Sequence, residues 1–274
     1  MLTNVRKCGN CYYNNTNNIL IITHGVCKKK GEYMNQLKVY EMRLKIYLLQ
    51  DISQEQTYAV FANYIDSCLA KNESLLELHE TNCYKQYCFD QPYPLEKDGI
   101  YKEGKVYTVR VRTVSDKLAQ YFADYLANHY NHQIKGLTVK ITIIPQKFIS
   151  QIFSITPVVI KCDGTESDRQ VKGYWKKCIS FEQYEERLKS NLIKKYNRLT
   201  GEKMNEDFDL YRQIELKNHK PIAVPYKGRK LLGDKVWLQA AENEQAQALL
   251  YMALGTGLGE MNARGCGFMN YRYL

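Results

Sequence analysis

The feature of this sequence best suited to chemistry is a glycine-rich stretch close to the C-terminus. Five glycines fall within thirteen positions there: Gly255, Gly257, Gly259, Gly265 and Gly267. Glycine permits positive φ angles and leaves backbone N–H groups uncovered, and successive uncovered N–H groups form nests that bind anions. Arg264 adds a positive charge. The stretch therefore predicts a phosphate-bearing ligand, and the alternative is a glycine-rich connector without a ligand.

Two familiar phosphate-binding motifs do not explain this stretch. A Walker loop ends in Gly-Lys-Ser/Thr, which is missing here. A dinucleotide fingerprint leads from a strand into a helix near the start of a βαβ unit. The order predicted here is the reverse, from a helix into the last strand. Both nucleotide-binding classes are therefore excluded.

Positive charge gathers in two other segments. Lys and Arg exceed Asp and Glu by 39 − 29 = +10, which favours a polyanionic partner because neutralised phosphates release counterions. One segment is a predicted hairpin around Gly228, flanked by Lys217, Lys220, Lys227, Arg229, Lys230 and Lys235. The other is a long predicted helix with Lys189, Lys194, Lys195 and Arg198. Both are candidates to follow a nucleic-acid backbone, and the alternative for each is a solvated basic surface.

The first 33 residues differ from the rest, since they are rich in Asn, Lys and Cys and lack clear periodicity. We expect the folded body to begin near Met34, with residues 1–33 as a disordered or non-native extension. The alternative is a tetrahedral zinc site, whose four candidate ligands are Cys8, Cys11, His24 and Cys27. The main prediction for the chain as a whole is no metal and no cofactor.

The cysteine content and the apolar runs indicate a compartment. The nine cysteines are an odd number without a regular framework, which favours reduced thiols. Residues 19–22 are too short an apolar run for a signal peptide, and no stretch approaches the roughly 20 apolar residues of a membrane span. We therefore predict a cytoplasmic protein without a membrane partner.

The elements that must position these residues follow from periodicity. Alternation of apolar and polar residues predicts half-buried strands, and recurrence every three or four residues predicts amphipathic helices. In the first half the expected strands cover 40–48, 84–89, 106–111 and 137–143, and the helices 58–69 and 118–129. The order strand, helix, strand, strand, helix, strand is that of a ferredoxin-like domain.

The same order repeats in the second half. Strands are expected at 152–160, 208–216, 222–226, 230–238 and 268–273, and helices at 181–196 and 246–254. Ser180 and Gln183 form a capping box for the first of these helices. The predicted fold is therefore α+β, with tandem ferredoxin-like domains at 34–147 and 148–274.

The glycine-rich stretch, taken with this order, resembles a known family. Gly257, Gly259, Gly265, Gly267 and Phe268 are similar to the signature loop of the repeat-associated RNA-binding superfamily of CRISPR-associated (Cas) proteins. Within it the chain resembles the sixth Cas family, the endoribonucleases that process precursor CRISPR RNA. The resemblance covers nearly everything after residue 34, and residues 78–87 and 107–112 support it.

The resemblance implies a mechanism and a set of site residues. It implies metal-independent attack by the RNA's own 2′-hydroxyl, which gives a cyclic phosphate end, with histidine transferring protons. Family members often carry that histidine on or near the first helix, but residues 53–71 contain none. The candidates are therefore His79, Lys85 and Tyr58, with Tyr64 as a further tyrosine. The alternative for His79 is a cap or a loop-orienting role.

The resemblance also implies partners. The expected RNA-binding residues are Gly257, Gly259, Arg264, Gly265, Gly267, Lys220, Lys227, Arg229 and Lys230. The expected partners are repeat RNA in precursor CRISPR RNA, other Cas effector subunits and, as an option, a second copy of the chain. The alternative function is a subunit that holds CRISPR RNA without cutting it.

Overall fold

The computed structural model describes residues 37–72, 75, 84–162 and 174–274, together with the backbone of four short strands before them. The chain divides into two compact units, Met1–Leu37 and Lys38–Leu274. The domain boundaries expected from the sequence stay predictions.

The first unit contains four strands paired in chain order. They are β1 (Arg6–Cys8), β2 (Cys11–Tyr13), β3 (Ile19–Thr23) and β4 (Val26–Lys28), which form one antiparallel sheet. Cys8 lies opposite Cys11 in its register. His24 lies outside the described residues, as does Met34, so the zinc alternative and the start of the folded body stay predictions.

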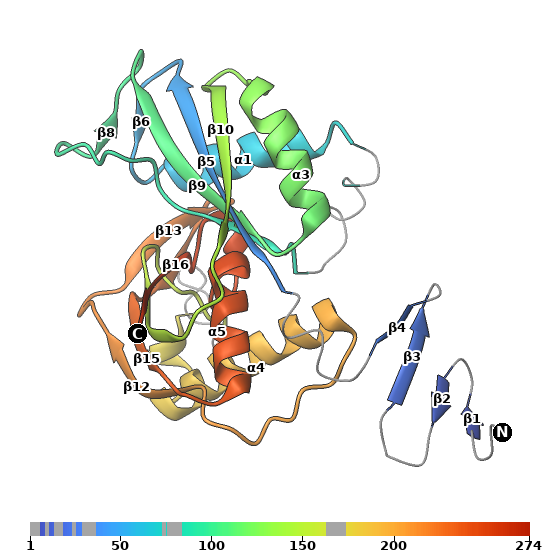
Figure 1. The fold of residues 1–274 in the computed structure, drawn as a ribbon. Helices are drawn as coiled ribbons and strands as arrows, with labels where there is room; N and C mark the ends of the chain where they lie inside the picture. The colour runs from blue at the N-terminus through green and yellow to red at the C-terminus, as the bar shows by residue number, and fades with distance from the viewer. Residues whose placement is uncertain are drawn as a thin grey trace. The chain divides into compact units, whose positions relative to one another are not determined.

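The first half of the second unit is a ferredoxin-like sheet (Figure 1). Its strands are β5 (Val39–Leu48), β7 (Tyr87–Phe89), β9 (Val106–Thr113) and β10 (Ile134–Ile144), in the antiparallel order β10-β5-β9-β7. Helices α1 (Thr57–Leu69) and α3 (Asp116–Tyr125) connect them. Their apolar residues bury one face of the sheet in a common core. A small ladder joins β6 (Ile52–Ser53) to β8 (Ile100–Tyr101).

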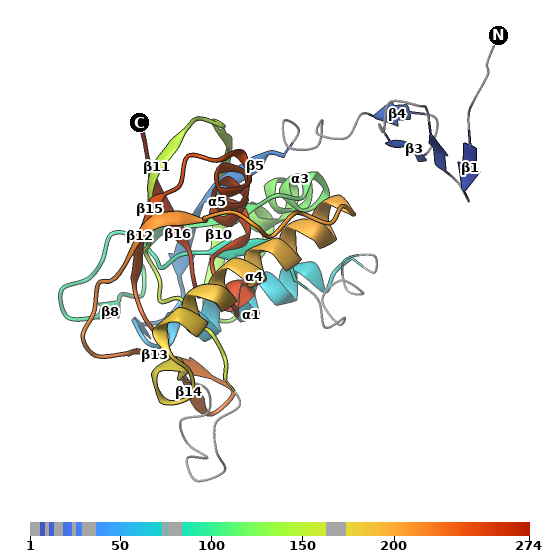
Figure 2. The ribbon, with the colours of Figure 1, turned by 90° about the horizontal axis from the view of Figure 1, so that it is seen from below.

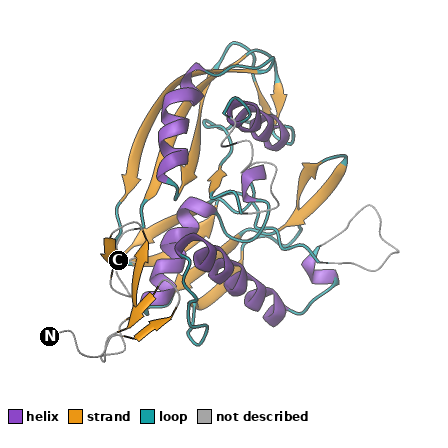
Figure 3. Cartoon of the chain, turned by 90° about the vertical axis from the view of Figure 1, so that its right-hand side faces the viewer, coloured by secondary structure: helices purple, strands orange, loops and turns teal. Residues whose placement is uncertain are grey.

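The second half repeats this topology (Figures 2 and 3). Strands β11 (Ile149–Ser154), β12 (Tyr211–Leu216), β15 (Val236–Ala240) and β16 (Met269–Tyr273) form a sheet in the order β12-β15-β11-β16. Helix α4 (Phe181–Thr200) follows the first strand and α5 (Glu244–Thr256) follows the third. The first strand of each half pairs with the third and the fourth. The predicted tandem ferredoxin-like fold is confirmed.

One predicted strand is divided between two sheets. The pattern at 230–238 predicts a single strand, but the structure has β14 (Arg229–Gly233), which pairs with β13 (Ile222–Tyr226), and then β15. The division falls at Asp234, whose buried carboxylate accepts hydrogen bonds from Tyr174 and Trp175. Gly233 and Asp234 interrupt the apolar residues at this point in the sequence, and this pair was the local signal that the strand is divided.

Two other expected elements end earlier than predicted. The helix expected to residue 129 ends at Tyr125 and continues as the 3-10 turn Leu126–Asn128. The strand expected to residue 160 ends at Ser154. Beyond it, Val158 and Val159 make single bridges to Asp234 and Glu260, because this segment supports the hairpin and the glycine-rich stretch rather than a sheet.

Candidate functional site

A cavity of about 600 Å³ lies between segments of both halves and the glycine-rich stretch. Its lining contains seven cationic side chains: Lys85, Lys161, Arg187, Lys194, Lys195, Arg198 and Arg264. One carboxylate, that of Glu260, is among the lining residues. Tyr84 and Tyr226 add aromatic rings. A cavity with this charge and these rings suits a nucleic acid, whose phosphates need cations and whose bases stack on aromatic side chains. We call it the basic pocket.

Helix α4 supplies one wall of the basic pocket. Ser180 caps the helix through the predicted capping box, which the structure confirms. The apolar stripe of the helix is buried and includes Tyr184, Leu188 and Leu192. The pocket-lining residues lie at helical spacings of four and three, so they share a face: Arg187, Asn191, Lys194 and Arg198. The helix therefore turns a basic row towards the cavity.

The segment 257–268, which we call the glycine loop, supplies another wall. Its ends are tied together, since Leu258 N donates to Gly267 O at 2.9 Å, and Gly267 N donates to Pro157 O at 2.8 Å. Phe268 N donates to Thr156 Oγ1 at 2.8 Å. Glu260 N donates to Val159 O at 2.8 Å. The loop is therefore fastened to the segment after β11 along its length.

The glycines of the loop are required by close packing inside the protein. A Cβ at Gly267 would lie 2.0 Å from Leu258 O, and one at Gly259 would lie 2.7 Å from Val159 O. Both residues have positive φ angles, as do Gly257 and Gly265. Uncovered N–H groups are expected at these glycines from the sequence. The N–H groups of Gly265 and Gly267 instead donate within the protein, and contact of the glycines with RNA stays a prediction.

A buried lysine holds the loop from beneath. Lys195 Nζ donates to Gly257 O at 2.8 Å, to Gly259 O at 2.9 Å and to Asn262 Oδ1 at 2.8 Å. The amide of Asn262 donates in turn to Leu258 O and Cys266 O, both at 3.1 Å. In the sequence, Lys195 stands out only as one charge on the helix. Its position seven residues after Leu188 was the signal of burial, because that spacing continues the apolar stripe.

Arg264 fixes the loop to the first half. Its guanidinium pairs with the Asp66 carboxylate of α1, and this ion pair raises the pKa of Arg264 against the effect of its burial. Arg264 also lines the basic pocket, as expected for a cation beside the glycines. Part of its charge is therefore balanced by Asp66.

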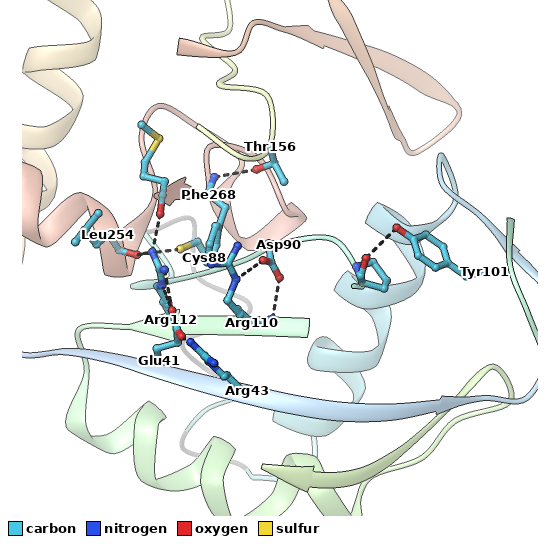
Figure 4. Close-up of polar contacts among 12 residues, drawn as sticks. Glu41, Arg43, Cys88, Asp90, Tyr101, Arg110, Arg112, Thr156, Leu254 and Phe268 are labelled. Atoms are coloured by element: carbon cyan, nitrogen blue, oxygen red, sulfur yellow. Dashed lines mark hydrogen bonds and ion pairs between the residues drawn. The ribbon is translucent and has the colours of Figure 1, made fainter. Parts of the chain in front are cut away.

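The end of the loop is anchored in the network of Figure 4. Arg112 is 1% exposed and donates to Glu41 Oε2 at 2.8 Å and to Met269 O at 2.6 Å. Its guanidinium also covers the Phe268 ring, with 4.4 Å to the ring centroid. Arg110 lies on the same ring at 4.9 Å. Strand β9, which carries both arginines, thereby fixes the position of the start of β16.

The structure separates the candidate catalytic residues. Lys85 lines the basic pocket beside Tyr84. Tyr58 is buried under the glycine loop, and burial raises its pKa, so the phenol keeps its proton. Tyr64 is also buried and donates to Leu126 O at 2.6 Å. His79 lies outside the described residues. The structure thus brings one of the three candidates to the pocket surface, and all three roles stay predictions.

The other described histidines differ in burial. His129 is packed in the interior: it is 4% exposed, its Nε2 is 2.8 Å from Ser67 Oγ, and burial lowers its pKa. His132 and His219 are exposed. None of these three is among the residues that line the basic pocket.

The basic hairpin is formed by β13 and β14, as predicted. Lys227 and Gly228 make its two-residue turn, and both have positive φ angles. Lys220, Lys227, Arg229 and Lys230 are exposed. Tyr226, at the end of β13, reaches the lining of the basic pocket. The hairpin thus presents its charges to solvent next to a pocket residue, and their contact with RNA stays a prediction.

Replacing Lys227, Arg229 and Lys230 by alanine is expected to flatten the dependence of log affinity on log salt. Removing one ionic interaction with a phosphate should lower the slope by about 0.7–0.9, because fewer counterions are released on binding. The measurement is repeat-RNA affinity at several salt concentrations. A triple replacement of the exposed lysines Lys45, Lys135 and Lys140 on β5 and β10 is the control for charge alone. Equal slopes for the two variants would contradict binding of phosphate by the hairpin.

Within the described part of the chain, no group of three or more His, Cys, Asp or Glu side chains could hold a metal ion. The zinc alternative involves residues beyond that part. Among the described helices, none has the length and apolar character needed to cross a membrane.

Comparisons with known proteins agree with the fold. Residues 144–271 match the family model described as CRISPR associated protein Cas6, C-terminal. No curated protein matches the sequence. A solved RAMP protein, described as binding different RNA substrates, is 17% identical with a TM-score of 0.63, over 85% of this chain and 99% of that chain.

Two further solved structures have the same fold. A Cas6-related protein from Pyrococcus furiosus is 17% identical with a TM-score of 0.61, over 85% of this chain and 98% of its own. A Cas6 product complex is 14% identical with a TM-score of 0.57, over 85% of this chain and 100% of its own. At these identities the structures establish the fold, while the family model covers the second half with the glycine loop. The resemblance is confirmed: residues 144–271 match the C-terminal model of the Cas6 family of CRISPR-associated proteins, and solved structures named Cas6 have the same fold.

Proposed function

We propose that this chain is an endoribonuclease that binds CRISPR repeat RNA and cuts precursor CRISPR RNA. The observation that carries the proposal is the basic pocket, which the family's C-terminal domain and the first half build together. Solved neighbours of the same fold include a protein described as binding RNA substrates and a Cas6 product complex. RNA is accordingly the proposed substrate.

The proposed reaction is internal transesterification. The 2′-hydroxyl gives up its proton as its oxygen attacks the adjacent phosphorus, the bond to the 5′-oxygen of the next nucleotide breaks, and that 5′-oxygen takes up a proton. The products are a 2′,3′-cyclic phosphate and a 5′-hydroxyl. The protein must align the attacking and leaving oxygens and stabilise the charge that develops on the phosphorane. Lys85 and the arginines of the pocket are the side chains proposed for the charge, and His79 is proposed for proton transfer.

The proposed partners follow from the same comparisons. Repeat RNA within precursor CRISPR RNA is the proposed ligand. Other Cas proteins are proposed as assembly partners, because a neighbour of similar fold occurs in a structure described as a Cas6-RT-Cas1–Cas2 complex. A soluble, cytoplasmic setting is part of the proposal.

Incubation of the full chain with the CRISPR repeat RNA of its own genome in EDTA tests the proposal. We expect two fragments, with a cyclic phosphate on the upstream one, because the nucleophile belongs to the RNA. A matched RNA with a 2′-deoxynucleotide at the scissile position should remain uncut. RNA that is bound but never cut would favour the alternative of a non-cleaving CRISPR RNA subunit. Cleavage of the deoxy RNA would contradict the mechanism.

A further inference from the structure

Lys195 is unusual among the basic residues of the pocket because it is buried. Its neighbour Lys194 on the same helix is exposed, whereas Lys195 is 5% exposed. Burying an ammonium group is costly unless hydrogen bonds replace its hydration. A lysine at a position of the apolar stripe therefore needs a specific set of acceptors.

The glycine loop provides that set. An ammonium group has three donors, and Lys195 Nζ has three oxygen acceptors within 2.9 Å: Gly257 O, Gly259 O and Asn262 Oδ1. The neutral amine has only two N–H groups and lacks the charge that strengthens such bonds. Loss of the proton therefore leaves one loop oxygen unpaired and weakens the other two bonds.

The groups around Lys195 have opposing effects on its proton. Burial lowers the pKa of Lys195 to about 7, while Cys88 on β7 and Glu260 in the loop act to raise it. The thiol of Cys88 is neutral near pH 7, because burial raises its pKa to about 12. The Tyr84 ring lies 5.8 Å from Nζ. The other cationic side chains of the basic pocket line the same cavity as Lys195.

We propose that Lys195 is a positioning residue whose protonated ammonium holds the glycine loop in its RNA-binding shape, so that RNA binding takes up a proton. The inference rests on the proposed function, because it takes the basic pocket to be the RNA site. Phosphates entering the pocket place negative charge near Lys195 and favour its charged form. RNA and the proton thus bind cooperatively, each strengthening the other.

The pH dependence of folding stability distinguishes a loss of RNA binding at Lys195 from a loss of the folded state. With a lowered pKa in the folded state, the unfolded chain holds a proton that the folded chain lacks between about pH 7 and pH 10.5. The contribution of Lys195 to the free energy of unfolding therefore rises with pH over this window. RNA affinity is expected to fall in the same window, so a loss of affinity there cannot come from unfolding caused by Lys195.

The experiment measures binding of repeat RNA with a 2′-deoxynucleotide at the scissile position, which cannot be cut by the proposed reaction. Calorimetry in two buffers of different ionisation enthalpy gives the protons taken up between about pH 6 and 9, a range that spans this pKa. For the wild-type chain we expect proton uptake and an affinity that falls by up to about tenfold per pH unit, the limit for one linked proton. Wild-type binding without uptake, at an affinity independent of pH, would overturn the inference.

Two variants assign the proton to Lys195. Lys195→Met keeps an unbranched side chain, one atom shorter and without the charge, and is expected to bind roughly ten- to a hundredfold more weakly at low pH, with the uptake lost. Lys194→Met removes the exposed neighbouring charge, and should weaken binding while keeping the uptake. Uptake that persists in Lys195→Met comes from another group and overturns the assignment.

If the Lys195→Met chain fails to fold, a second variant still tests the inference. Lys195→Arg keeps a charge at every pH of the range, so it is expected to bind RNA without the loss of affinity at high pH. A Lys195→Arg chain with the wild-type pH dependence would overturn the inference by itself. Binding without cleavage of normal repeat RNA contradicts only the proposed nuclease activity, whereas no RNA binding at any pH contradicts both proposals.

Discussion

Replacing His79 by alanine is expected to slow single-turnover cleavage of repeat RNA by about 10²–10⁴-fold, the usual contribution of a positioned general acid or base. RNA affinity should change little, because the contacts with phosphate come from other side chains. His79 precedes Tyr84 by five positions, and Tyr84 and Lys85 both line the basic pocket. The measurement is the rate with enzyme in excess, together with the dissociation constant of the uncut deoxy RNA.

His132→Ala is the matched control for His79→Ala. His132 is exposed and is not among the residues that line the pocket, so its replacement should leave the rate unchanged. If His79→Ala cuts at the wild-type rate, the assignment of His79 is wrong. In that case Lys85→Ala is the next variant to measure, because Lys85 is the catalytic candidate that lies at the pocket.

Gly265→Val is expected to abolish binding of repeat RNA in a chain that stays soluble. A Cβ at Gly265 would lie 2.8 Å from Phe89 Cε2 and 3.0 Å from Tyr58 Cδ1, and φ is +83°. Valine is β-branched and strongly disfavours this backbone region. The loop must therefore move away from the first half, and the adjacent Arg264 is displaced from Asp66.

The control for Gly265→Val is Gly201→Val at the end of α4. Gly201 has a similar φ of +74° but no atoms within 4 Å of its Cβ position, so this variant has the backbone strain without the displacement of the loop. RNA affinity is measured on both variants after circular dichroism has established that they are folded. Wild-type affinity in folded Gly265→Val would rule out a role of the loop shape in binding.

The sequence by itself determined the order of the elements. Alternation at 40–48 and 106–111 predicted β5 and β9, and the stripe from 181 to 196 predicted α4 with its capping box. These signals are local, because one face of each element is buried and the other is solvated. The hairpin around Gly228 was predictable for the same reason. The glycine spacing was specific enough to indicate the family.

Only the tertiary structure decided how the site is assembled. The basic pocket joins Lys85, Arg187 and Arg264. Along the chain these residues are separated by 187 − 85 = 102 and 264 − 187 = 77 positions. No local pattern relates such residues, because their proximity depends on how the two sheets pack. Arg264 was predictable as a cation beside the glycines, but its pairing with Asp66 was not.

Lys195 and the glycines show the physical reason most directly. In the sequence, Lys195 is one of several basic residues on a helix, and the glycines are a run with conformational freedom. In the folded chain the lysine is surrounded by oxygen atoms of the loop, and the glycines leave room for Val159 O, Leu258 O and the Phe89 ring. Charge and flexibility are properties of a residue type and can be predicted from the sequence. Burial and close approach are properties of the surroundings, which form only when distant segments pack together.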